Sequence, residues 1–199
     1  MQTVTQEQET TETTTPAPRK WQACPSNPPG SIQVNKFNKA MSRLSSEHNT
    51  RKEKWGVIGL IHDLDYEKFP DQHCTQTGEI LRQHGWPEEY IRAAVSHGWG
   101  ICSDLMPQTS LEKVLYAIDE LTGLVVTTAL IRPSKSVLDV QVKSVKNKWK
   151  DKRFAAGVDR SVIEKGAEML QVGLDELIDD TIKGMQEVAE AIGLRGNPP

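Results

Sequence analysis

The strongest constraint on the fold is a long apolar helix signal that starts at Thr109 and ends near Arg132. Thr109 and Glu112 have the spacing of a capping box, in which each side chain bonds the backbone of the other residue. Pro133 marks the end, because proline cannot continue a helix. Between these limits, apolar residues at helical spacing predict an inner face made of Val114, Leu115, Ile118, Leu121, Leu124 and Val125.

Helical spacing recurs through the rest of the chain, and no hairpin signal or sustained alternation is present. The basic residues 51–54 are expected to form a solvated turn and helix start, and Asp159 and Asp175 are expected to be N-caps. The other helices are expected at residues 31–49, 55–64, 75–84, 87–97, 136–150, 158–170 and 174–192. The sequence therefore predicts an all-α fold of about seven helices.

Residues 1–30 differ from the rest, because they are rich in Thr, Gln, Glu and Pro and poor in apolar residues. Such a segment cannot bury enough apolar surface to offset its chain entropy, so a disordered tail is expected, followed by a helical domain at 31–195.

The net charge of −3 argues against a general nucleic-acid binder. No apolar run reaches the length of a membrane span, and no secretory signal is recognised.

The three cysteines, Cys24, Cys74 and Cys102, are far apart and form no C-x-x-C pair. This spacing argues against a disulfide framework or a structural zinc knuckle and is typical of a reducing compartment. A cytoplasmic location is therefore expected.

The apolar run from Val57 to Ile61 ends abruptly in His62 and Asp63. An imidazole and a carboxylate gain nothing from apolar surroundings, and an unpaired charge there is costly. A divalent cation would compensate, since both groups are good ligands for Zn, Fe or Mn. On the dipeptide alone, a helix end with a hydrogen-bonded imidazole is the more common arrangement.

Three further residues change that balance. His73 and His97 lie at or just beyond expected helix ends, near loops that can face one another. Asp119 lies in the middle of the apolar helix, where a carboxylate needs a partner or a raised pKa. Because Asp119 and Glu120 are adjacent, one of them is expected to face outward, and helical phase favours Asp119 as the inward one. The alternatives for Asp119 are a salt bridge or an exposed helix face.

Taken in order, these motifs resemble the HD-domain superfamily of metal-dependent hydrolases, and more narrowly its bacterial and archaeal hydrolase branch. The resemblance covers about residues 55–194. It is carried by His62-Asp-Leu-Asp-Tyr66, His73 with Thr77-Gly-Glu-Ile-Leu81, Pro87-Glu-Glu-Tyr-Ile91 leading to His97, Tyr116-Ala-Ile-Asp-Glu-Leu-Thr-Gly123, and Arg132-Pro-Ser-Lys-Ser136.

The resemblance implies a ligand set for one or two divalent ions of Mn, Fe, Zn or Ni. His62, Asp63 and Asp119 would hold one metal, and His73 and His97 resemble the additional histidines of dinuclear members, in which the aspartate of the pair bridges both ions. One departure is clear. The family pattern begins with an upstream histidine, which by register falls near Gln33, and no histidine precedes His48.

The activity implied is that of a phosphohydrolase acting on a small phosphorylated substrate such as a nucleotide. Asp65 or His97 would protonate the leaving group, and Arg132 and Lys135 would bind a substrate phosphate. Arg132 lies about 20 Å along a straight helix from Asp119, so a solvated helix end is an equal alternative for it. Two other functions stay open: a di-iron oxidative enzyme, and a non-catalytic interaction protein, which the missing histidine favours.

Overall fold

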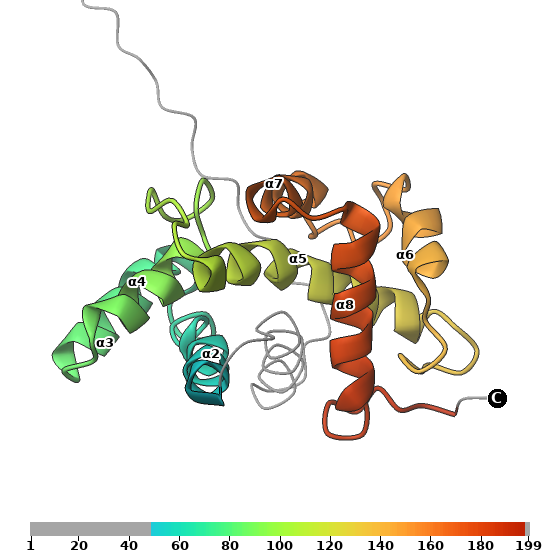
Figure 1. The fold of residues 1–199 in the computed structure, drawn as a ribbon, viewed down its shortest axis with the longest axis horizontal. Coiled ribbons are helices and arrows are strands. Elements are labelled where there is room, and N and C mark those ends of the chain that lie inside the picture. The colour runs from blue at the N-terminus through green and yellow to red at the C-terminus, as the bar shows by residue number, and fades with distance from the viewer. Residues whose placement is uncertain (1–48, 198–199) are drawn as a thin grey trace, which may run out of the picture.

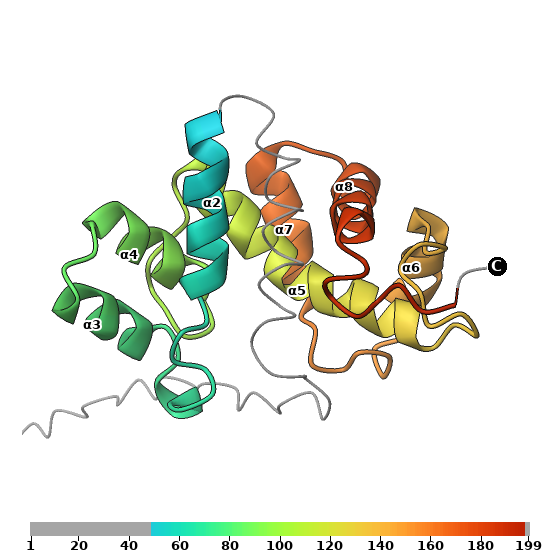
Figure 2. The ribbon, with the colours of Figure 1, turned by 90° about the horizontal axis from the view of Figure 1, so that it is seen from below.

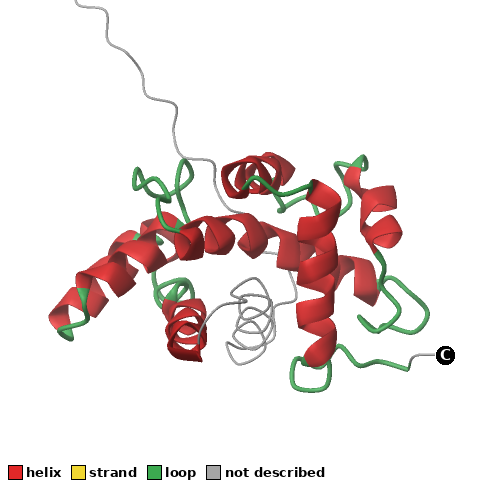
Figure 3. Ribbon diagram, in the orientation of Figure 1, coloured by secondary structure: helices red, strands yellow, loops and turns green. Residues whose placement is uncertain are grey.

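The computed structural model describes residues 49–197, which form helices and connecting loops without a β-strand (Figures 1 and 3). An isolated bridge joins Trp99 and Ser103. The all-α prediction is confirmed for this part of the chain. Its elements are α2 (Asn49–Ile61), the 3-10 helix η1 (Pro70–Gln72), α3 (Thr75–Gln83), α4 (Glu88–Ser96), α5 (Ser110–Leu130), α6 (Val142–Trp149), α7 (Arg160–Leu170) and α8 (Leu174–Glu187).

Helix α5 runs through the middle of the molecule, and four helices pack against it: α4, α6, α7 and α8 (Figures 1 and 2). Helices α2 and α3 reach it through α4, which contacts both of them. All six residues predicted for the inner face of α5 are buried. The apolar face predicted from sequence thus lies at the centre of the core, and burial of such apolar surface is the main driving force for folding.

The ends of α5 are fixed as predicted. The Thr109 side chain accepts a hydrogen bond from the Glu112 backbone N–H, and the Glu112 carboxylate accepts one from the Thr109 N–H. The helix ends at Leu130, three residues before Pro133. Helix α7 lies close against α5, because a Cβ added to Gly166 would lie 2.4 Å from the Cβ of Ala117. Only glycine allows this approach.

Several predicted boundaries are wrong. Residues 51–54 belong to α2, which begins at Asn49 and ends at Ile61 rather than at residue 64. Helix α6 begins at Val142 instead of residue 136, and α8 ends at Glu187 instead of residue 192. Tertiary hydrogen bonds explain the late start of α6, because the Val137 N–H donates to the Leu194 carbonyl across the core.

The two expected N-caps have different outcomes. Asp159 caps α7 and accepts a hydrogen bond from the Ser161 backbone N–H. Asp175 does not cap α8: Gly173 is the N-cap, and Asp175 lies in the first turn, where it pairs with Lys146. A negative charge in a first turn still stabilises the positive end of the helix dipole.

The expected tail at 1–30 and the expected helix at 31–49, with Gln33 and His48, lie outside the described residues except at Asn49, where α2 begins. Within residues 49–197, no helix combines the length and apolar character needed to cross a membrane.

Candidate metal centre

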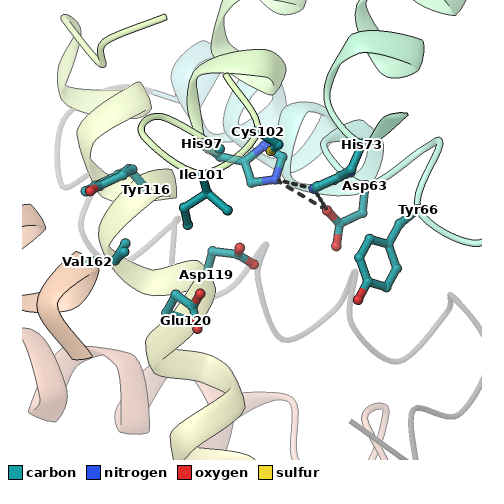
Figure 4. Close-up of a pocket in the computed structure, with 11 residues that line it drawn as sticks. Asp63, Tyr66, His73, His97, Ile101, Cys102, Tyr116, Asp119, Glu120 and Val162 are labelled. Atoms are coloured by element: carbon teal, nitrogen blue, oxygen red, sulfur yellow. Dashed lines mark hydrogen bonds and ion pairs between the residues drawn. The ribbon is translucent and has the colours of Figure 1, made fainter. Parts of the chain in front are cut away.

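Five predicted ligands meet beside the middle of α5, although four separate segments supply them. Figure 4 shows Asp63, His73, His97 and Asp119. His62 and Asp63 directly follow α2, His73 lies between η1 and α3, His97 ends α4, and Asp119 lies within α5. The packing of α4 against α2, α3 and α5 brings these segments together. Each side chain therefore enters the centre from a helix or from a helix end.

The Asp63 carboxylate lies among the three imidazoles. Its Oδ1 is 3.5 Å from His73 Nε2 and 3.4 Å from His97 Nε2. Its Oδ2 is 3.3 Å from His62 Nε2, which is also 3.6 Å from Asp119 Oδ1. All three Nε2 atoms therefore face carboxylate oxygens around one space.

The outer nitrogen of each imidazole has its own partner. His62 Nδ1 donates to the Gly59 carbonyl at 2.8 Å, and His97 Nδ1 donates to the Ala94 carbonyl. A carbonyl oxygen only accepts, so the proton of each neutral ring is on Nδ1 and the Nε2 lone pair faces the centre. Histidines that bind metals have this arrangement, in which the outer N–H fixes the orientation of the ring.

His73 is oriented by a carboxylate instead. Its Nδ1 is 2.7 Å from Asp65 Oδ1, and its Nε2 is 3.1 Å from His97 Nε2. Two lone pairs that face each other at this distance repel unless a proton or a cation lies between them. The donor set therefore fits a divalent cation, with imidazole nitrogens and carboxylate oxygens as ligands.

Burial and charge shift the acid–base behaviour of these groups in opposite directions. Burial alone would lower the pKa of His62, but the neighbouring charges of Asp63 and Asp119 raise it well above its usual value. Burial alone would raise the pKa of Asp63, but His62 and His97 hold it well below its usual range. Protons on imidazole thus balance the carboxylates, and a metal ion would compete with them.

Asp65 does not match the expectation that it protonates a leaving group. Its side chain is fully buried, and it does not line the pocket beside the centre. One oxygen accepts from His73 Nδ1, and the other accepts from the Thr77 backbone N–H at 2.7 Å. Although burial opposes ionisation, these hydrogen bonds lower the pKa of Asp65. The structure makes it a positioning residue for His73.

A pocket of about 50 Å³ opens beside the candidate ligands. This volume admits a few groups the size of a water molecule. Its lining residues come from α5, α7 and the segments that follow α2, η1 and α4 (Figure 4). They are Asp63, Tyr66, His73, His97, Gly98, Ile101, Cys102, Tyr116, Asp119, Glu120 and Val162.

Glu120 was expected to face outward if Asp119 faced inward, and this expectation is wrong because both residues line the pocket. The Glu120 side chain is 6% exposed. Its Oε2 accepts from the Asp159 backbone N–H at 3.1 Å, and its Oε1 has no hydrogen-bond partner within residues 49–197. Burial, together with the charge of Asp119, raises the pKa of Glu120 to about 8. The sequence signal was present, since Glu120 also lies in the apolar part of α5.

The spacing of the cysteines in the sequence did not predict that two of them are neighbours in the fold. Cys74 and Cys102 lie 2.4 and 2.2 Å from the position that a Cβ at Gly98 would take, so their sulfurs are neighbours. Both are free thiols. A hydrogen bond with Cys74 and the nearby imidazoles lower the pKa of Cys102 to about 7, whereas that hydrogen bond and burial raise the pKa of Cys74.

The structure does not bring Arg132 and Lys135 to the centre. They follow the C-terminal end of α5 and do not line the pocket. The Arg132 guanidinium donates two hydrogen bonds to the Asp139 carboxylate, at 2.9 and 3.0 Å. Although later helices pack back onto α5, Arg132 and Lys135 stay away from the pocket, so the expectation that they bind a phosphate at the candidate ligands is wrong.

Searches of family models, curated proteins and solved structures found no match to this chain. What is known of the centre therefore comes from its own geometry and from the motifs in its sequence.

Proposed function

We propose that this protein is a metal-dependent hydrolase of the HD-domain type, which uses one or two divalent ions to hydrolyse a phosphate ester. One observation carries the proposal: two imidazole Nε2 atoms face each other at 3.1 Å while their outer nitrogens are engaged elsewhere. A proton or a cation would relieve that contact, and the surrounding imidazole and carboxylate donors are good ligands for a divalent cation.

The candidate donors lie on both sides of Asp63, and atoms of His62, His97 and Asp119 also lie within 4.8 Å of one another. His62 and Asp119 lie on the side of Asp63 Oδ2. His73 and His97 lie on the side of Oδ1. Asp63 would therefore help to hold ions on both of its sides, and a pair of ions would supply a nucleophilic water and offset the charge of a phosphate. The geometry therefore favours two ions.

Bound divalent ions would lower the pKa of a water molecule and offset the negative charge of a phosphate group. The chain itself orients the three imidazoles through their Nδ1 atoms, while the Asp63 and Asp119 side chains stay partly exposed to solvent. Glu120 borders the pocket next to Asp119, so we place it, by its position, as the proton donor to a leaving group. His97 fits this role less well, because its ring already contacts Ala94 and Asp63.

The direct test is the metal content per chain after loading with Mn, Fe, Zn or Ni and removal of the excess. Wild type should hold two ions, Asp63→Ala should lose both, and His73→Ala should lose one. His84→Ala is the matched control, because His84 is an exposed histidine that caps the end of α3 outside the centre. Loaded wild type should also release phosphate from p-nitrophenyl phosphate, whereas Asp63→Ala should not.

If wild type retains no metal, and a chelator does not change its thermal unfolding, the proposal is wrong and a non-catalytic interaction protein is favoured. The shared position of Asp63 also favours a second candidate, an oxidative reaction at a di-iron pair. Oxygen consumption by the iron-loaded protein, without phosphate release by the manganese-loaded protein, would select that candidate.

A further inference from the structure

We propose that Cys74 and Cys102 are a reversible redox pair, which hydrogen peroxide or an organic hydroperoxide converts to a disulfide beside the candidate metal centre. The proposal rests on the geometry of the two thiols and does not depend on the proposed hydrolase activity.

The first observation is that residue 98, which lies next to both sulfurs, is a glycine and has no side chain that would separate them. Both sulfurs lie within 2.4 Å of the point where a Cβ on Gly98 would be, so any side chain at position 98 would displace them. The backbone also holds Cys102 in place. The N–H groups of Ile101, Cys102 and Ser103 all donate to the Gly98 carbonyl, at 2.9, 2.9 and 3.1 Å. This tight loop presents the Cys102 sulfur to Cys74.

The second observation is the backbone of Cys74, which has φ 67° and ψ −43° at the N-cap of α3. A residue with a Cβ rarely occupies this left-handed region, and such conformations occur where surrounding structure enforces them, often at functional sites. At this position the Cys74 carbonyl still accepts the first α3 hydrogen bond, from the Gly78 N–H. The unusual backbone is thus built into the start of α3 and places the Cys74 sulfur beside that of Cys102.

The two thiols differ in access. Cys74 is fully buried, whereas Cys102 is partly exposed and lines the pocket. A small oxidant that enters the pocket therefore meets Cys102 first. This difference matches the usual division between a thiol that is oxidised and a second thiol that resolves it.

The reaction takes place in two balanced steps. The Cys102 sulfur attacks one peroxide oxygen, the O–O bond breaks, and Cys102 becomes a sulfenic acid while the peroxide is reduced to one water, or to an alcohol for an organic hydroperoxide. The Cys74 sulfur then attacks the Cys102 sulfur, the S–O bond breaks, and the hydroxide leaves with the Cys74 proton as water. A dithiol reductant reverses the cross-link by thiol–disulfide exchange.

The cross-link would join the two segments that carry candidate ligands. Cys74 follows His73 directly, and Cys102 lies in the loop that follows His97. The disulfide would therefore tie the start of α3 to this loop, next to the 3.1 Å contact between the two imidazoles.

Peptide mapping of the full-length protein tests the proposal, because trypsin places each cysteine in its own peptide: 21–36, 69–82 and 93–113. The reduced protein, in chelator and without reductant, is treated with one equivalent of hydrogen peroxide, alkylated under denaturing conditions and digested. Peptides 69–82 and 93–113 should appear linked, two hydrogens lighter than their sum, and dithiothreitol should restore both thiols. Cys24 in peptide 21–36 reports non-specific oxidation.

Two variants identify the order of the steps. In Cys74→Ser, Cys102 should remain a sulfenic acid that dimedone labels, and in Cys102→Ser, Cys74 should stay a free thiol. The proposal is overturned if wild-type Cys102 proceeds to sulfinic acid while Cys74 stays alkylatable. It is also overturned if either cysteine links to Cys24 as often as to the other. The wild-type map decides the question even if a variant fails to fold.

Discussion

Replacement of Glu120 by glutamine should change how the stability of the metal-free protein depends on pH. The carboxyl group is buried between the Asp119 charge and the Asp159 backbone, and its pKa is raised from 4.5 to about 8. A carboxyl group whose pKa is higher in the folded state stays protonated there at pH values at which it has already ionised in the unfolded chain. Its contribution to the free energy of unfolding therefore falls as the pH rises. Its contribution is therefore fully present below pH 4.5 and is lost as the pH rises toward 8.

The size of the effect follows from the two pKa values. With 1.36 kcal/mol for each unit, the wild type should lose about 3 kcal/mol of unfolding free energy between pH 5 and pH 7.5 through this residue. Glutamine has nearly the same volume and can still accept from the Asp159 N–H, but it does not ionise. Shifts at His62 and His73 affect both proteins equally, so they cancel in the difference between the two.

Urea unfolding of wild type and Glu120→Gln, in chelator at half-unit steps from pH 5 to pH 7.5, measures that difference. Glu120→Gln should gain on wild type by about 3 kcal/mol across the range. Asp139→Asn is the control: its hydrogen bond with Arg132 lowers the pKa of Asp139, so its stabilising contribution is lost only as the pH falls below about 4, and its gap to wild type should stay constant. A constant gap for Glu120→Gln as well would show that Glu120 is ionised throughout.

Three further substitutions test the site and the fold. Asp65→Asn should weaken metal binding about 10–100-fold in equilibrium dialysis, because it disturbs the partner that orients His73; unchanged affinity would show that Asp65 does not act through His73. Gly166→Ala should lower the unfolding free energy in urea by about 2 kcal/mol, since the new methyl group meets Ala117; an unchanged midpoint would mean that α7 shifts freely. Arg132→Ala should lower the unfolding free energy by about 1 kcal/mol, because it removes the hydrogen bonds to Asp139, and should leave the metal content unchanged. A loss of metal would show that Arg132 does act at the centre.

The fold could be predicted where its signals are local. The capping box at Thr109, the proline that follows α5 and the N-cap Asp159 act within a few residues of themselves. The start of α6 could not be predicted in this way. Val137 and Val140 have helical spacing and are buried, but the Gln186 side chain donates to both of their carbonyl oxygens from α8. Long-range hydrogen bonds replace the helix there.

The same distinction holds at the candidate centre. Residue type and position at helix ends picked out His62, Asp63, His73 and His97 as candidates, and the resemblance of the ordered motifs grouped them with Asp119. The role of Asp65 was missed, since it depends on how α3 presents Thr77 to it. The cysteine pair was missed for a similar reason: residues 28 positions apart become neighbours only when α3 and α4 pack together and the next loop folds over Gly98.

The geometry of the remaining donors weakens the argument that the missing upstream histidine makes against a catalytic protein. The family position falls near Gln33, which lies outside the described residues. Within the described part, the side of the centre at Asp63 Oδ2 still has three protein donors, from His62, Asp63 and Asp119. Catalytic metal sites commonly use three protein ligands and leave a position open for water or substrate, whereas structural sites are closed by a fourth. Within the described residues, this side of the centre therefore keeps the number of protein ligands that catalytic sites use, and the missing histidine carries no weight against a site that must admit a substrate.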